Sequence, residues 1–156
     1  MTTNAQEAVA MFKEGYNCAQ SVFAAAARPY GLAKETALRV GQAFGGGMGR
    51  TGNVCGAVTG ALMVIGFKRA ALDPKDLQAK LDAHGIAQAF LASFAAKHRS
   101  LLCRDLLGCD IATAEGFKQV QDQNLHSTVC APLVESAVNL IEQLLAPSKD
   151  RREREA

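Results

Sequence analysis

The chain has 156 residues, of which 49% are hydrophobic and 21% are charged, a balance typical of one folded globular domain. Its 17 basic and 15 acidic residues leave a formal net charge of +2, and no basic stripe alternates with aromatic side chains, which argues against nucleic-acid binding. The longest stretch without a charge, residues 51–67, is too short to span a membrane, so we expect no membrane-embedded segment. The N-terminus lacks the features of a secretory signal, which predicts a cytoplasmic protein.

The spacing of hydrophobic residues predicts helices in the first half of the chain. Residues 5–28 carry apolar side chains at helical spacing, with Asn4 as the expected N-cap, and a shorter helix is expected over 34–44. Residues 45–53 include five glycines, a composition that predicts a loop. Directly after this loop, residues 55–70 are apolar on nearly every side, which indicates a central buried helix.

The helical pattern continues in the second half of the chain. Asp73 and Pro74 predict the start of a helix that reaches about residue 97. Its expected buried residues are Leu77, Leu81, Phe90, Leu91 and Phe94. A short turn over 100–108 and a helix over 113–123 follow, and a last helix begins near 128–132.

No segment alternates with the two-residue period of a strand. The sequence therefore predicts an all-α fold: a single-domain bundle of five to six helices around a buried central helix that a Gly-rich loop precedes. We expect this domain to cover residues 1–146 and residues 147–156 to form a charged, disordered tail.

Cysteine is the most informative residue type in the chain. There are five cysteines, an odd number, and no two form a C-x-x-C pair, which argues against a disulfide framework, a thioredoxin-type motif and a zinc ribbon. They are spread along most of the chain, so the fold must bring them together if they act together. They are Cys18, Cys55, Cys103, Cys109 and Cys130.

Cys55 has the strongest local signal, because it follows the glycine loop and begins the buried helix. Free backbone N–H groups and the helix dipole at that position favour a thiolate, and Arg50 would add to this effect if it folded back. Cys103 and Cys130 also lie near predicted helix starts. Cys55 is therefore the expected nucleophile of any thiol chemistry.

The remaining candidate residues have weaker signals. Cys18 is expected inside the first helix as a small core residue, and Cys109 is expected in a turn with no special role. The three histidines show no metal-binding spacing and are expected at the surface. They are His84, His98 and His126.

Four segments taken in this order resemble the C_GCAxxG_C_C family of redox proteins: YNCAQSV, FGGGMGRTGNVCGAVTGALMVIG, LLCRDLLGCD and VCAPLV. The resemblance extends from about Tyr16 to Leu144. It implies that the family cysteines are Cys18, Cys55, Cys103 and Cys130 and that Cys109 is an addition of this chain. It also implies redox-active cysteines, and related domains fused to electron-transfer modules have been proposed to hold a cysteine-bound iron–sulfur centre.

The first hypothesis is an iron–sulfur protein for electron transfer or redox sensing, with a redox partner protein. The four family cysteines match the ligand count of a [2Fe–2S] or [4Fe–4S] cluster. Nearby glycines would let backbone N–H groups approach the cluster sulfurs. These cofactor-binding candidates are Gly46, Gly47, Gly49 and Gly56.

Three alternatives remain open. In a thiol–disulfide protein, Cys55 would be the nucleophile and Cys130 or Cys18 would resolve the mixed disulfide. The cysteines could instead form a structural zinc site, or stay reduced in a helical interaction domain without catalysis. The glycine-rich, weakly charged middle of the chain is also compatible with a homodimer.

Overall fold

The computed structural model describes residues 1–147, and within them every secondary-structure element longer than an isolated bridge is a helix. The α-helices are α1 (Asn4–Glu14), α2 (Cys18–Ala27), α3 (Lys34–Gly41), α4 (Gly45–Met48), α5 (Gly56–Arg69), α6 (Leu77–His98), α7 (Cys103–Leu107), α8 (Ala114–Asp122) and α9 (Ala131–Leu145). Short 3-10 helices cover Arg28–Tyr30 and Gln42–Phe44, and a π-helical turn covers His126–Cys130. The all-α prediction is confirmed, although the chain is divided into more and shorter helices than the expected five or six. The expected tail lies, except for Pro147, outside the described residues.

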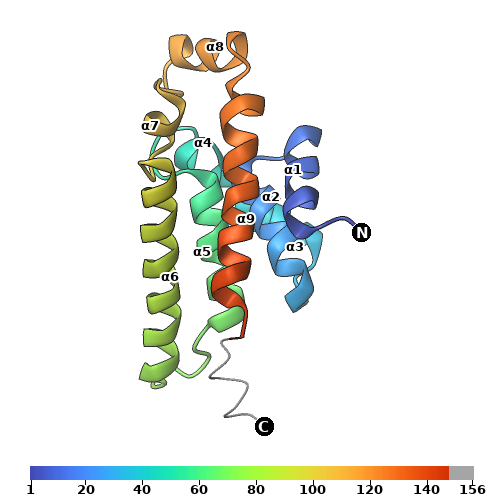
Figure 1. The fold of residues 1–156 in the computed structure, drawn as a ribbon, viewed down its shortest axis with the longest axis vertical. Helices are drawn as coiled ribbons and strands as arrows, with labels where there is room; N and C mark the ends of the chain where they lie inside the picture. Colours follow the sequence, from blue (N-terminus) through green and yellow to red (C-terminus); the bar gives the residue numbers. More distant parts are fainter. Residues whose placement is uncertain (148–156) are drawn as a thin grey trace.

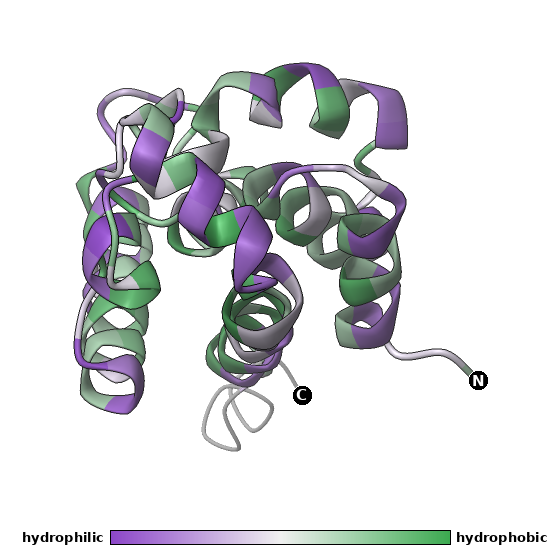
Figure 2. Cartoon of the chain, turned by 90° about the horizontal axis from the view of Figure 1, so that it is seen from above, coloured by the Kyte–Doolittle hydropathy of each residue, from purple (hydrophilic) through white to green (hydrophobic). Residues whose placement is uncertain are grey.

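The long helices α5, α6 and α9 run along the molecule, and α1, α2 and α3 lie on one side of them (Figure 1). Helix α8 crosses one end, above α7 and the start of α9. Viewed from that end, much of the hydrophobic surface of the helices faces the interior (Figure 2). No helix within residues 1–147 has the length and apolarity needed to cross a bilayer.

The centre of the core is a pair of helices, α2 and α5. Helix α5 is largely buried, as expected, and nine of the ten residues of α2 are buried as well. The two helices approach closely where α5 has no side chains: a Cβ atom at Gly60 would lie 2.9 Å from the carbonyl oxygen of Ala19. Small residues therefore set the distance between the two central helices.

The prediction of one helix over 5–28 is wrong, because the helix is interrupted between α1 and α2. Gly15 ends α1 in a left-handed conformation, with φ of 113°, which glycine adopts without a steric penalty. Asn17 then caps α2 through its side chain, and Thr3 rather than Asn4 caps α1. The break makes Cys18 the first residue of a helix instead of an interior residue.

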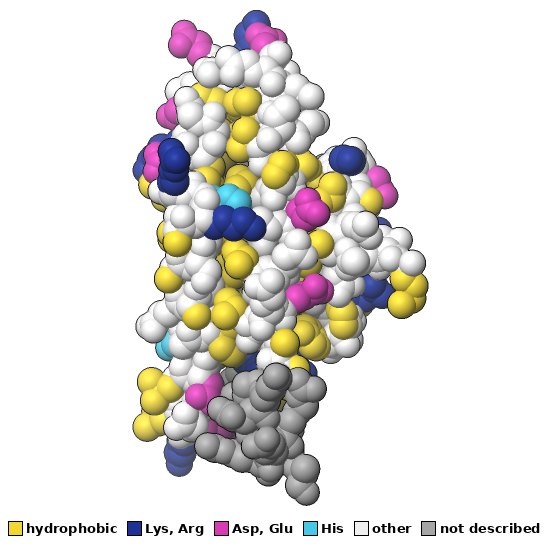
Figure 3. Space-filling model, viewed as in Figure 1, with side chains coloured by type: hydrophobic (Ala, Val, Ile, Leu, Met, Phe, Trp, Pro, Cys, Tyr) yellow, Lys and Arg dark blue, Asp and Glu magenta, His cyan; other side chains and the backbone are white. Residues whose placement is uncertain are grey.

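Helix α6 is buried only in its second half. Its N-cap is Asp76 rather than Asp73, and the predicted core residues Leu77 and Leu81 are 69% and 65% exposed. Figure 3 shows hydrophobic side chains on the surface at the end of the molecule where α6 begins. The fully buried residues of α6 are Phe90 and Phe94.

Two glycines of α5 offer a matched test of the α2–α5 contact. We expect Gly60→Ala to lower the free energy of unfolding by about 1–3 kcal/mol, because the new methyl group would press on the backbone of α2. Gly66 has no heavy atom within 4 Å of its Cβ position, so Gly66→Ala should raise stability by about 0.5–1 kcal/mol through helix propensity. Urea denaturation of both variants measures these changes, and equal effects would contradict the close packing.

Candidate functional site

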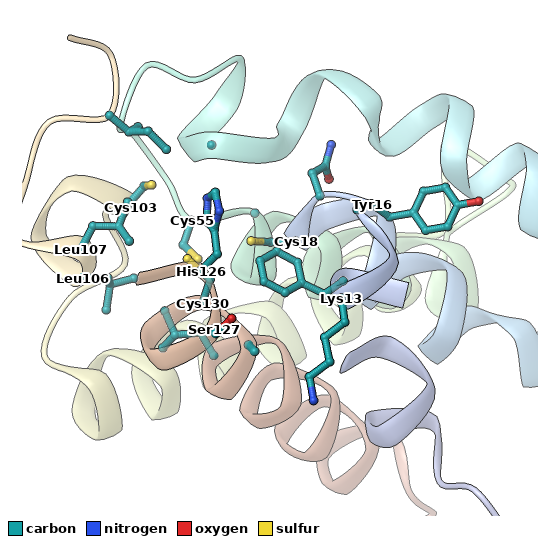
Figure 4. A pocket seen from close by; sticks show the side chains of 18 residues that line it. Lys13, Tyr16, Cys18, Cys55, Cys103, Leu106, Leu107, His126, Ser127 and Cys130 are labelled. Atoms are coloured by element: carbon teal, nitrogen blue, oxygen red, sulfur yellow. The ribbon is translucent and has the colours of Figure 1, made fainter. Parts of the chain in front are cut away.

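Four of the five cysteines line one cavity of about 430 Å³ near the end of the molecule that α8 covers. We call them the cavity cysteines: Cys18, Cys55, Cys103 and Cys130. They come from the start of α2, the N-cap of α5, the start of α7 and the π-helical turn before α9. Figure 4 shows the thiols of Cys18, Cys55 and Cys130 directed toward the same space, with Cys103 at its side.

Backbone pairing between two distant segments places Cys55 next to Cys103. The N–H of Cys55 donates to the carbonyl of Leu101 at 2.8 Å, and the N–H of Cys103 donates to the carbonyl of Asn53 at 2.6 Å. This isolated antiparallel bridge joins residues 52–55 to residues 101–104. It has no hydrophobic period of its own, so sequence patterns could not predict it.

The glycine-rich segment forms a tight left-handed turn instead of an open loop, so α4, which lies within it, is not a regular right-handed helix. The five consecutive residues 46–50 all have positive φ, between 61° and 70°. The hydroxyl of Thr51 closes the turn by donating to the carbonyls of Gly47 and Met48, both at 2.8 Å. Met48 and Arg50 pay a steric penalty in this conformation, and such strain is concentrated at functional sites in proteins.

The four glycines predicted to bind a cofactor divide into two groups. Gly46 and Gly56 line the cavity, whereas Gly47 and Gly49 do not. Gly56 allows α5 to meet the start of α2, since its Cβ would lie 2.9 Å from the Cβ of Cys18. Gly47 acts behind the cavity wall, where its Cβ would lie 2.7 Å from the Cβ of Cys103.

Cys18 and Cys130 line the same cavity and influence each other's ionisation. Interaction with the other thiol is the largest cause of a lowered pKa at Cys130 and of a raised pKa at Cys18, where burial adds to the increase. Cys130 is therefore the thiol of this pair that ionises first, because its neighbour stabilises its charge.

Cys55 and Cys103 have the opposite character. Burial raises the pKa of Cys55 to about 11, although the backbone N–H groups of Ala57 and Val58 act to lower it. Burial also raises the pKa of Cys103 to about 12. The prediction that the start of α5 lowers the pKa of the Cys55 thiol is thus wrong, because the cost of burying the charge exceeds the gain from the helix end.

Two further expectations about local charge are corrected. Cys130 does not lie at a free helix end, because the π-helical turn His126–Cys130 continues directly into α9. Arg50 does not fold toward Cys55; its guanidinium lies 3.8 Å from the centre of the Phe117 ring in α8. A free helix end therefore does not account for the lowered pKa of Cys130, and Arg50 does not add positive charge beside Cys55.

Cys109 lies outside the cavity lining but near it. It is half-buried, and its thiol donates to the carbonyl of Gly116 at 3.7 Å. It packs against the apolar cluster that contains Cys103 and Cys130. The fifth cysteine is thus a neighbour of the cavity cysteines, which its sequence position did not indicate.

His126 is the cavity residue that sequence reasoning missed. Its imidazole lines the cavity, lies edge-on to Phe12 with ring centres 6.0 Å apart, and has a pKa lowered by burial. It begins the π-helical turn that ends at Cys130, and π-helical turns occur often at functional sites. The four-residue separation of His126 from Cys130 was the only available signal.

The lowered pKa values of two histidines should make the folding stability of the protein depend on pH. Burial lowers the pKa of His98 and His126 below their ordinary value of 6.5, and Nε2 of His98 pairs with the Ser136 hydroxyl at 2.8 Å. Protonation of these histidines therefore favours the unfolded chain. The free energy of unfolding should keep their full contribution above about pH 6.5 and decrease as the pH falls below it. Urea denaturation between pH 7.5 and pH 5 measures this loss. His98→Gln should show a shallower loss, and an unchanged slope would contradict the assignment.

Within residues 1–147 no group of three or more His, Cys, Asp or Glu side chains is arranged to hold a metal ion. The cavity cysteines nevertheless supply the four thiols that a [2Fe–2S] or [4Fe–4S] cluster uses, and they are distributed around a cavity wall. The four thiols therefore match the donor type and number of a cluster, but within residues 1–147 they are not arranged as a metal site.

Comparison with known proteins gives one match. Residues 16–144 match the sequence family described as "Putative redox-active protein (C_GCAxxG_C_C)". The match covers all five cysteines and every helix that contributes to the cavity except α1. Neither the curated proteins nor the solved structures gave a match.

Proposed function

Because the chain belongs to the C_GCAxxG_C_C family of putative redox-active proteins, we propose that it carries out thiol–disulfide exchange through Cys18 and Cys130. The observation that carries this proposal is the position of the two thiols in one cavity, together with the pKa of Cys130, which its neighbour Cys18 lowers. Cys130 is the nucleophile and Cys18 is the resolving cysteine. This assignment replaces Cys55, whose pKa burial raises.

The exchange balances with a disulfide as the oxidant. The thiolate of Cys130 attacks one sulfur of a partner or small-molecule disulfide, forms a mixed disulfide and releases one thiolate. Cys18 then attacks the sulfur of Cys130, its proton goes to the second leaving thiolate, and the Cys18–Cys130 disulfide forms. The protein loses two electrons and the external disulfide becomes two thiols. The partly open cavity gives the external disulfide access to both cysteines.

Redox titration in buffers of reduced and oxidised glutathione tests this proposal. The wild-type protein should lose two alkylatable thiols in one two-electron step, counted by mass after denaturation and alkylation. The disulfide should map to the peptides of Cys18 and Cys130, and Cys130→Ser should lose the step, because this variant lacks the attacking sulfur. Cys55→Ser is the matched control within the cavity and should keep the step; its loss in Cys55→Ser would show that another pair reacts.

The second candidate is an iron–sulfur cluster held by Cys18, Cys55, Cys103 and Cys130, and it is favoured by the position of all four in one cavity. A bound cluster would supply one-electron transfer to a redox partner protein. Purification without oxygen, followed by assays of iron, zinc and acid-labile sulfide, separates the candidates. Iron with sulfide, lost in each of the four serine variants and kept in Cys109→Ser, would favour the cluster.

A further inference from the structure

Two half-buried cysteines neighbour Cys130, and one of them lies inside the cavity while the other lies outside its lining. Cys18 lines the cavity, whereas Cys109 is absent from the cavity lining and packs on the apolar cluster around Cys103 and Cys130. Both Cys18 and Cys109 have more exposed surface than Cys130, which is 8% exposed. Cys130 therefore has two neighbouring cysteines, one in the cavity and one outside its lining.

The segment that carries Cys109 is fixed against α8. The thiol of Cys109 donates to the carbonyl of Gly116, and the Thr113 hydroxyl donates to the carbonyl of Asp110 at 2.9 Å. Gly116 has no room for a side chain because a Cβ atom there would clash with the backbone carbonyl of Asp110. This packing holds Cys109 beside the Cys103–Cys130 cluster and at the protein surface.

The electrostatics of the cysteines agree with this placement. The charges of Asp110 and Cys130 both raise the pKa of Cys109, after the contribution of burial. Cys109 also contributes to the raised pKa of Cys103. Cys109 is thus within electrostatic reach of two cavity cysteines although it lies outside the cavity.

We propose that Cys109 is a second exchange partner of Cys130 and transfers the disulfide from the cavity to the protein surface. The inference rests on the proposed thiol–disulfide function. The sulfur of Cys109 attacks the sulfur of Cys130 in the Cys18–Cys130 disulfide, so a Cys109–Cys130 disulfide forms and Cys18 leaves as a thiolate that takes up the proton of Cys109. This step moves the disulfide from one pair of cysteines to another without net oxidation or reduction of the protein, so it needs no further oxidant.

The surface disulfide has a defined next reaction. A thiol outside the protein, from a partner protein or a small molecule such as glutathione, attacks Cys109 and forms a mixed disulfide while Cys130 leaves as a thiolate. A second external thiol then releases Cys109 and leaves with the first as a disulfide. The external thiols thus lose the two electrons that the protein gains.

Disulfide mapping in the Cys18→Ser protein tests the role of Cys109, because this variant leaves Cys130 with Cys109 as its proposed partner. After treatment with oxidised glutathione and alkylation, we expect peptides joined through Cys109 and Cys130. The double variant Cys18→Ser/Cys109→Ser should instead carry glutathione on Cys130. The same glutathione adduct in the single variant, with Cys109 still alkylated, would overturn the inference, and so would a Cys103–Cys130 disulfide.

A second measurement uses the wild-type protein and does not depend on how the variants fold. Oxidised protein is mixed with less than one equivalent of reduced glutathione and quenched in acid at successive times. The Cys109–Cys130 disulfide should appear before reduction is complete, and its absence at every time would contradict the transfer. Failure of the Cys18–Cys130 disulfide to form at all would instead contradict the proposed function, so the two failures are distinguishable.

Discussion

Cys18→Ala should slow the alkylation of Cys130 by iodoacetamide at pH 7 by about tenfold or more. The neighbouring Cys18 thiol is the cause that lowers the pKa of Cys130, and burial alone would raise it. Hydrogen bonds to charged groups contribute about 1.5–3 kcal/mol, and 1.36 kcal/mol corresponds to a tenfold change in the thiolate population. The rate is measured from the mass of the peptide that contains Cys130, over a range of pH.

Two variants serve as controls for this rate. Cys18→Ser keeps a hydroxyl donor and should restore part of the reactivity of Cys130, although it cannot form a disulfide. Cys103→Ala removes a cavity cysteine that does not lower the pKa of Cys130, so the rate should stay near the wild-type value. A rate that Cys18→Ala leaves unchanged would show that Cys130 does not depend on its neighbour.

Gly47→Ala should be the most damaging single change in the left-handed turn. Its φ is +70°, and a Cβ there would lie 2.6 Å from the backbone nitrogen of Asn53 and 2.7 Å from the Cβ of Cys103. The left-handed backbone costs about 1–2 kcal/mol in a residue with a side chain, and the overpacking adds about 1–3 kcal/mol. Urea denaturation gives the loss, and faster alkylation of Cys103 would report its displacement.

Gly49 provides the control in the same turn. Its φ is +69°, almost the same as that of Gly47, but its Cβ position lies 3.8 Å from the nearest atom, the carbonyl oxygen of Ala43. Gly49→Ala should therefore lose only the backbone contribution of about 1–2 kcal/mol. If the two variants are equally stable, the contact between the turn and the wall that carries Cys103 is not important.

The sequence was sufficient to predict the helical class and most helix ends, because these depend on local signals. Thr113 caps α8, Gly108 ends α7, and α5 begins after Cys55, all close to the predicted positions. The helix over 5–28 failed because a continuous apolar pattern hid the break at Gly15. Leu77 shows the opposite limit, since apolar spacing does not reveal whether another element covers that face.

The sequence was sufficient to predict which cysteines form the candidate site. It was not sufficient to predict which of them are neighbours or which has the lowered pKa. The four family cysteines could be identified from their motifs, but their neighbours depend on contacts across long separations. The bridge of Val54 with Leu102 brings Cys55 to Cys103, and the break before α2 turns Cys18 toward Cys130. The acidity of a thiol depends on burial as well as on helix ends, so the position of Cys55 alone gave the wrong pKa direction.

The most direct test of the proposed function is a disulfide map of the wild-type protein during oxidation by oxidised glutathione. The five cysteines lie in five different tryptic peptides, so each pairing gives its own mass. The first cross-link to form should join Cys18 to Cys130. A first cross-link between any other pair, or complete alkylation of Cys18 and Cys130 after oxidation, would contradict thiol–disulfide exchange through these two cysteines.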